Sequence, residues 1–525
     1  MRAPAVVAAR ALPRWLTLAS IGLGFFVFAI DSLLLAAGGP TLAGELRGVE
    51  LVGWLFTAYL LMWTVTGPLF GKLSDLHGRR PILLVGLGFY AAGAILAALA
   101  GSMEQVIACR LIQGIGGGAV ASVSYTAAGD LYPPAERAKS QVVFSVAYLV
   151  AAIVAPPLGA LLVMSVSWRA IFLVDALFAA VAAVAIALTL RERVQARPHR
   201  LDLAGAAVLM GGAGALMLAL AFASREGTWT STPQVVLYAL AALGAVAFVW
   251  IERRAAEPLV PLGLFHSRVM VGSCLVTLAL GGCVWACSAF VPLFVQGVLD
   301  RSPFEAGLVS LPMNSAWLAT NLLAVPLLWR WGYRTASVSG MAALMLGFVL
   351  LAQIGPSLPF AYPLVLLAVL VQGLGLGFAN TVVIVAVQNA VPWGERGAAT
   401  AGATFFRSFG PTLVISALQT IVNARVAMEL AARSVTLDQL AGAGVSRVGQ
   451  ANALLAPELR STLDPAALEA VRAALEVSLH QSFWLLGGVG LLGCLAAFLL
   501  PGGSPERHVW SDEASPAVRP REAGG

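Results

Sequence analysis

Residues 71–81 read GKLSDLHGRRP and lie between two long apolar runs, near 52–71 and 81–101. Each run is long enough to cross a bilayer as a helix. An acid at a helix end can pair with neighbouring arginines and lock two helices together, and a change in this pairing can release them. We therefore interpret the loop as a conformational switch; the alternative is a basic loop that only orients the chain. The switch residues are Gly71, Asp75, Gly78, Arg79 and Arg80.

Apolar runs of this length recur along the whole chain. Of its 525 residues, 59% are hydrophobic and 11% are charged, and the mean hydropathy is +0.86, which excludes a soluble globular protein. The runs between charges and Pro/Gly breaks predict an all-α polytopic membrane protein with fourteen transmembrane helices. The predicted spans lie near 15–41, 52–71, 81–101, 105–128, 140–164, 168–190, 201–223, 234–251, 270–299, 305–329, 335–354, 362–387, 398–423 and 481–500.

The basic residues indicate how the spans are oriented. With both termini in the cytoplasm, the inner segments carry 21 lysines and arginines and the short outer loops carry three. This bias follows the positive-inside rule, so we predict a multi-pass protein with both termini inside. Only Lys72 and Lys139 of the 32 basic residues are lysines, a bias typical of a GC-rich coding sequence, so we expect the bacterial cytoplasmic membrane. The net charge of +6 is then a topology signal, and no basic cluster interleaved with aromatics indicates nucleic-acid binding.

The order of the spans predicts the domain organisation. We expect a cytoplasmic N-terminus (1–14), a six-helix bundle (15–190), two additional helices (191–258), a second six-helix bundle (259–500) and a disordered cytoplasmic tail (501–525). Within the second bundle, the segment 424–480 contains a helix-favouring run at 465–479. We expect it to form one or two surface helices on the outside, and a passive connector is the alternative.

Several chemistries are absent from the sequence. All five cysteines lie inside apolar spans, where they are typical packing residues, so we expect neither a disulfide nor a metal site. No Walker motif is present, which excludes ATP as the driving force. Five scattered histidines provide no catalytic cluster at one interface, which argues against an integral membrane transferase. We expect a protein that is not an enzyme and uses no cofactor.

The motifs resemble those of the major facilitator superfamily. Residues 71–81 resemble its G-x-L-x-D-R-x-G-R-R signature, with Leu76 in place of an arginine. Residues 110–118 resemble R-x-x-Q-G-x-G, and 155–160 resemble the antiporter motif G-P-x-L-G-G. That antiporter motif is represented here by Pro156, Pro157 and Gly159.

Further segments narrow the resemblance to one branch. Residues 168–172, 290–296 and 388–392 are similar to the fourteen-span drug:proton antiporters, the EmrB/QacA-like multidrug efflux transporters. The resemblance implies two six-helix bundles plus two extra central helices. Residues 331–334 (WGYR) echo 78–80 at the corresponding position of the second half, as two similar bundles would leave.

Charges inside the spans point to the mechanism, because each costs about 3 kcal/mol on insertion scales unless it is paired or hydrated. Asp31 and Asp175 are the acids that lie well inside the spans and not at their ends, and Arg110 lies at a depth comparable to that of Asp31. We interpret Asp31, Arg110 and Asp175 as proton-coupling residues. Asp31 is either the site where proton and substrate compete or a structural partner of Arg110. Asp175 is either a second titrating group or a partner of Arg169.

A substrate site is expected between the two bundles near the midplane. Aromatic residues of the first two spans could stack on a flat substrate there, although packing or lipid-facing roles are the alternative. The polar groups could equally be interhelical hydrogen-bonding residues. The candidate substrate-binding residues are Asp31, Gln113, Asn314, Asn380, Gln388 and Arg407.

These observations, together with the resemblance, predict proton-coupled efflux of lipophilic or amphipathic small molecules such as antibiotics. The alternative is a proton symporter that imports a small nutrient. With few acids inside the spans and with Arg110 and Arg407 present there, we expect neutral, zwitterionic or singly charged substrates in preference to dications. The expected partners are the substrate, protons and the lipid bilayer. We expect a monomer, and an accessory periplasmic partner is left open.

Overall fold

The computed structural model describes residues 13–46, 51–133, 136–192, 202–226, 229–255, 258, 262–392, 395–433 and 465–503, and these residues are helical with connecting turns. The long helices are α1 (Arg14–Glu45), α2 (Val52–His77), α3 (Arg79–Ala98), α4 (Met103–Asp130), α6 (Val142–Ser165), α7 (Arg169–Thr189), α8 (Leu203–Glu226), α9 (Thr232–Glu252), α10 (Arg268–Gly297), α12 (Ser310–Leu351), α13 (Ala361–Asn389), α14 (Arg396–Ala432) and α18 (Pro465–Ala497). Three short elements, α5 (Arg137–Ser140), η3 (Leu262–His266) and α11 (Pro303–Leu308), lie at the ends of long ones.

Twelve stretches of the described helices are long and apolar enough to cross a membrane, which confirms a polytopic helical membrane protein. The predicted spans 52–71 and 305–329 lie in helices, but they are not among these twelve. Both stretches carry several glycine, threonine, tryptophan or asparagine residues, which lower their hydropathy. The twelve candidate spans therefore fall short of the fourteen predicted.

Two glycines with positive φ make the same turn in the two halves of the chain. Gly78 (φ 95°) separates α2 from α3, and Gly332 (φ 76°) breaks α12 into two helical parts. Residues with a Cβ rarely adopt this conformation, so glycine is needed at both positions. The echo between 78–80 and 331–334 thus corresponds to the same helix–turn–helix connection.

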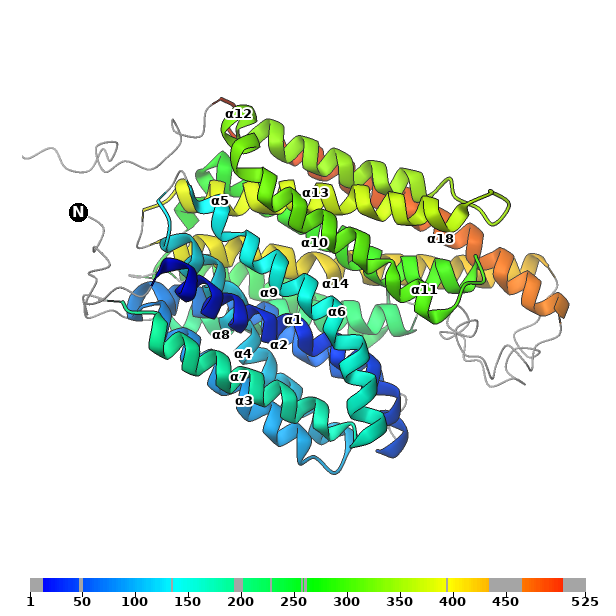
Figure 1. The fold of residues 1–525 in the computed structure, drawn as a ribbon, viewed down its shortest axis with the longest axis horizontal. Helices are drawn as coiled ribbons and strands as arrows, with labels where there is room; N and C mark the ends of the chain where they lie inside the picture. Colours follow the sequence, from blue (N-terminus) through cyan, green and yellow to red (C-terminus); the bar gives the residue numbers. More distant parts are fainter. Residues whose placement is uncertain are drawn as a thin grey trace, which may run out of the picture.

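The helices pack as two groups. In the first group α4 packs against α2 and α3, α1 packs against α6, and α3 packs against α7; in the second, α12 packs against α13 and α18, and α10 against α14 and α18. Figure 1 shows α3 and α7 at one edge of the molecule and α12, α13 and α18 at the opposite edge. The groups meet mainly through α2 with α14 and α6 with α12. The helices α8 and α9 form a pair in which α8 contacts α2 and α14.

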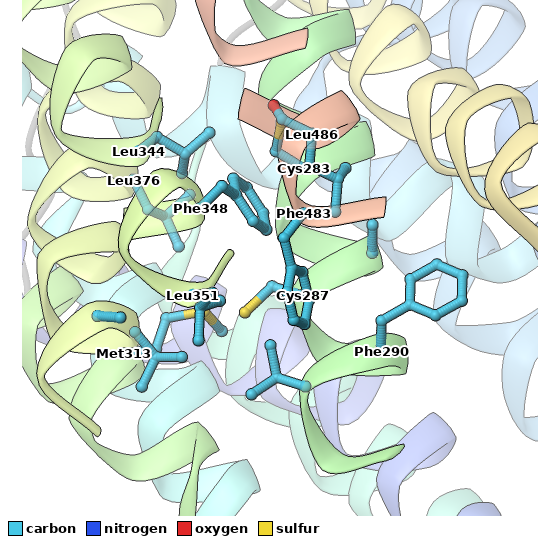
Figure 2. Packing of buried hydrophobic residues seen from close by; sticks show 14 of the residues in the cluster. Cys283, Cys287, Phe290, Met313, Leu344, Phe348, Leu351, Leu376, Phe483 and Leu486 are labelled. Carbon is cyan, nitrogen blue, oxygen red and sulfur yellow. The ribbon is translucent and has the colours of Figure 1, made fainter. Parts of the chain in front are cut away.

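Each group has its own packed interior. Figure 2 shows part of the interior of the second group, where Cys283 and Cys287 of α10 lie among Phe348, Phe483 and Leu486. The five cysteines are buried free thiols. In the first group α4 approaches α2 closely, because a Cβ at Gly114 would lie 2.6 Å from the Tyr59 carbonyl oxygen. Small residues permit such close helix packing within a bilayer.

The described parts of the segment 424–480 are continuations of long helices. Residues 424–432 belong to α14, and the helix predicted at 465–479 is the beginning of α18. Residues 434–464 of this segment, residues 1–12 and residues 504–525 lie outside the described residues. At the end of the molecule that holds Gly78, α2 meets α3, α4 ends, and α10 and α14 begin. We call this the Gly78 end.

Candidate proton and substrate sites

Asp31 and Arg110 form a buried ion pair between α1 and α4. The guanidinium of Arg110 donates two hydrogen bonds to the carboxylate, with Nη1 2.6 Å from Oδ1 and Nη2 2.8 Å from Oδ2. Both residues are 0% exposed. A bidentate pair of this kind combines strong attraction with a fixed geometry. The sequence places Asp31 and Arg110 at similar depths in the membrane, and the structure shows that the two side chains pair.

Neighbouring groups complete the surroundings of Arg110. Its Nε donates to the Leu55 carbonyl oxygen at 3.0 Å, and its guanidinium lies 4.3 Å from the centre of the Tyr59 ring. Gln113, one turn along α4, accepts from Arg110 at 2.9 Å and donates to Asp31 at 3.2 Å. These contacts offset the cost of removing both charges from water. Gln113 is thus part of the ion-pair cluster.

Asp175 of α7 joins the same cluster. It is 0% exposed, and its carboxyl group lies within hydrogen-bonding reach of Asp31. With Asp31 and Asp175 both ionised, neither carboxylate oxygen of Asp175 has a hydrogen-bond donor among the described residues. Arg169, the alternative partner from the sequence, pairs with Glu45 at 3.6 Å. The cluster therefore has two acids for one cation, so one proton bound by either acid would make it neutral.

At the Gly78 end, Asp75 joins the two helix groups. Its carboxylate accepts hydrogen bonds from the backbone N–H groups of Gly397 and Ala398 at the beginning of α14, both at 2.8 Å. These N–H groups have no acceptor within their own helix, and the helix dipole favours an anion there. Arg79 binds the same carboxylate. The segment predicted to be a switch thus contacts both helix groups.

Residues outside the predicted switch extend this network. Asp130 at the end of α4 pairs with Arg79 at 3.2 Å and with Arg396 at 3.3 Å. Glu192 accepts a hydrogen bond from the backbone N–H of Arg79 at 2.6 Å. Sequence reasoning did not connect Asp130 and Glu192 with the segment 71–80, and the signal available was an acid near the end of an apolar run.

A second set of contacts joins the groups near α5. Arg137 donates to the Gln388 carbonyl oxygen at 3.0 Å and also binds the Asn389 side chain. The Gln388 side chain donates to the Tyr125 carbonyl oxygen at 3.0 Å. Burial, together with the nearby Arg396, lowers the pKa of Arg137 to about 10. Gln388, a predicted substrate residue, therefore lies in a contact between the groups at the Gly78 end.

A cavity of about 70 Å³ lies between the two groups, and it is lined from α1, α2, α6, α10, α12, α13 and α14. Six of its thirteen lining residues are aromatic. Two predicted substrate residues, Asn314 and Arg407, line it, whereas Asp31, Gln113 and Gln388 do not. Asn380 lies behind Arg407 and accepts a hydrogen bond from it at 3.3 Å. The aromatic lining residues are Phe25, Phe28, Trp63, Tyr148, Trp285 and Trp317.

The antiporter motif residues belong to α6, which packs against α1. In this contact Ala155 lies with Ile30 and Leu34, the apolar neighbours of Asp31 on α1. Pro157 is exposed and Gly159 is buried. The predicted motif, which includes Pro156, is thus on the helix that packs against the segment around Asp31.

The comparisons with known proteins agree with this fold. Residues 21–415 match the Major Facilitator Superfamily, and the chain belongs to this family of membrane transporters. The protein is therefore a transporter and not an enzyme. Members of the family are typically driven by ion gradients without cofactors.

Two relatives and one solved structure are informative. The chain is 31% identical to the multidrug transporter protein MdtP of Bacillus subtilis (strain 168), covering 88% of this chain and 86% of the relative. It is 27% identical to multidrug resistance protein 3 of the same organism, covering 88% and 90%. The crystal structure of the human organic anion transporter MFSD10 superposes with a TM-score of 0.61 over 93% of this chain and 100% of that chain; at 17% identity it shows the fold alone.

Proposed function

We propose that the protein exports lipophilic or amphipathic small molecules across the cytoplasmic membrane in exchange for protons. The observation that carries this proposal is the buried cluster of two acids and one arginine beside an aromatic cavity. The multidrug relatives support efflux of drug-like compounds. We place the chain in the fourteen-span drug:proton antiporter branch, with the domain boundaries given above and both termini in the cytoplasm.

The proton acts on the pair of Asp31 and Arg110. When a proton arrives on Asp31, the carboxyl group loses its charge and holds the guanidinium less strongly. Arg110 then favours other acceptors, which changes the packing of α1 against α4. Asp175 is the neighbouring group that can give a proton to Asp31 or take one from it. Two protonation states thus correspond to two helix arrangements, as alternating access requires.

The links at the Gly78 end supply the gate of this cycle. The contacts of Asp75 and Asp130 with α14, and those of Arg137 with α13, hold the two groups together there. A cycle that exposes the cavity at this end must break them. Because several contacts hold the two groups together, each of them can be weak. A small structural change at the ion-pair cluster can therefore shift the equilibrium between the closed and the open arrangement of this end.

The test is proton release from energised inverted vesicles during the addition of lipophilic antibiotics and dyes. We expect a response with the unmodified protein, loss of the response in Asp31→Asn, and retention in Asp300→Asn. Asp300 is the matched control, because it is a half-exposed acid that pairs with Arg472 away from the cavity. Equal responses in the unmodified protein and Asp31→Asn would overturn the role of Asp31. Substrate accumulation driven in the opposite direction would favour the importer.

A further inference from the structure

The cavity between the groups contains one charged lining residue. Its thirteen lining residues include six aromatic side chains, Asn314 and Arg407, and no acid. Such walls bind flat apolar rings by stacking and by exclusion of water. A cationic compound would meet the positive charge of Arg407 without an acidic counter-ion in the walls. The positive charge of the lining therefore favours aromatic anions over aromatic cations.

Arg407 differs from Arg110 in its partners. Its Nη1 donates to the Tyr125 hydroxyl at 3.0 Å and to the Asn380 carbonyl oxygen at 3.3 Å, and the guanidinium lies 5.0 Å from the centre of the Tyr125 ring. All of these partners are neutral, whereas Arg110 has a bidentate carboxylate. A guanidinium has five N–H donors, so Arg407 can still bind an anion through its remaining donors. A carboxylate matches this fork geometry.

Asn314 supplies a second, independent observation. It is 1% exposed, lines the cavity, and its Oδ1 has no hydrogen-bond partner among the described residues. A buried carbonyl oxygen without a donor is costly, and a ligand that brings an O–H or N–H group removes this cost. Asn314 and Arg407 come from α12 and α14, so a ligand between them also contacts both helices.

We propose that the substrates of this cavity are aromatic amphiphiles that carry a single carboxylate. The carboxylate pairs with Arg407, the ring system lies among the tryptophans and phenylalanines, and a hydroxyl or N–H group of the substrate donates to Asn314. This assignment rests on the proposed efflux function and specifies its substrate class. It makes the ion-pair cluster a proton site and the cavity a separate anion site.

The experiment compares three matched probes on purified protein in lipid nanodiscs. Equilibrium binding of 1-naphthylacetate, its neutral amide and 1-naphthylethylamine is measured on the unmodified protein and on variants. We expect the carboxylate to bind about tenfold or more tightly than the amide, with the amine weakest, because hydrogen bonds to charged groups give discrimination of this order. Arg407→Gln should remove the preference, and Arg407→Lys should keep part of it.

The matched control is Arg425→Gln. Arg425 lies on the same helix α14, outside the cavity lining, and donates to Gln481 at 2.7 Å. This variant loses one cation and should keep the full preference for the carboxylate. A carboxylate preference that survives Arg407→Gln, or an amine that binds as tightly as the carboxylate, would overturn the proposal. Arg407→Lys keeps the test valid if Arg407→Gln does not fold.

Failure of the substrate assignment and failure of the efflux function give different results. If lipophilic cations or neutral dyes release protons in inverted vesicles while the carboxylate shows no preference in binding, the assignment is wrong and efflux stands. If the carboxylate binds with dependence on Arg407 but no compound exchanges with protons, the proposed efflux function is wrong and the anion site stands.

Discussion

At the scale of single residues, Arg110 and Arg407 differ in whether the guanidinium is paired with a carboxylate. Arg110 is fully buried and faces Asp31, while Arg407 faces a hydroxyl and an amide at the cavity wall. A buried pair contributes little net stability, yet removal of one partner leaves an uncompensated charge. The first arginine is therefore suited to respond to a proton, and the second to hold an anion.

A double-mutant cycle tests the first of these roles. We expect Arg110→Gln to destabilise the protein by about 3 kcal/mol or more, because it leaves buried carboxylates without their cation. Asp31→Asn should destabilise it by less, because Asp175 remains beside Arg110. The double variant should be more stable than the sum of the two effects predicts, with a coupling energy of about 2 kcal/mol. The free energy of unfolding in mixed micelles measures both. Additive effects would contradict a direct pair.

At the scale of helices, close packing between α2 and α4 supports the site. Arg110 and Gln113 lie on α4 directly before Gly114, and the Leu55 carbonyl oxygen and the Tyr59 ring that contact Arg110 come from α2. The distance between these two helices thus sets how well the guanidinium is held. A helix that moved away by a fraction of an ångström would loosen both contacts.

Two glycine substitutions isolate this effect. In Gly114→Ala the new Cβ lies 2.6 Å from the Tyr59 carbonyl oxygen, so α2 must shift, whereas Gly88 is exposed on α3 with nothing within 4 Å of a Cβ. Both variants gain similar helix propensity. We expect Gly114→Ala to be less stable than Gly88→Ala by about 1–3 kcal/mol, the usual cost of overpacking. Equal unfolding free energies would show that the two helices have room to adjust.

At the scale of the whole molecule, the proposed proton site and the proposed anion site together would set how much charge crosses the membrane in one transport cycle. The inward movement of a proton and the outward movement of a monoanion each transfer one net positive charge into the cell. One-for-one exchange of a carboxylate therefore moves two charges per cycle, and exchange of a neutral compound moves one. Each charge gains about 2.3 kcal/mol per 100 mV from an inside-negative potential.

This difference can be measured in proteoliposomes. We expect the reversal potential with 1-naphthylacetate and a proton gradient to correspond to two charges per substrate, and with its amide to one charge. The sign follows from the direction of proton movement and does not depend on how the protein is inserted. The same charge per cycle for both compounds would contradict one-for-one exchange with an anionic substrate.

The chain's own sequence was sufficient for the helical membrane architecture and for the position of the turn between α2 and α3. Hydropathy is a property of consecutive residues, and the bilayer selects any apolar run of sufficient length. The turn at Gly78 and its echo at Gly332 were equally readable, because a positive φ needs glycine. The ion pair of Asp31 with Arg110 could be anticipated from depth alone, since few other charges lie at that level.

The partners of the remaining polar residues were decided by tertiary structure. From the sequence, Asp175 was either a second titrating group or a partner of Arg169. In the fold Asp175 lies near Asp31, and Arg169 pairs with Glu45. Gln388 was expected in the substrate cavity, but it lies among the contacts at the Gly78 end. Such partners depend on the rotation of each helix about its axis and on which helix lies beside it. Hydropathy fixes the depth of a residue in the membrane, and only packing between distant segments fixes the direction in which its side chain points.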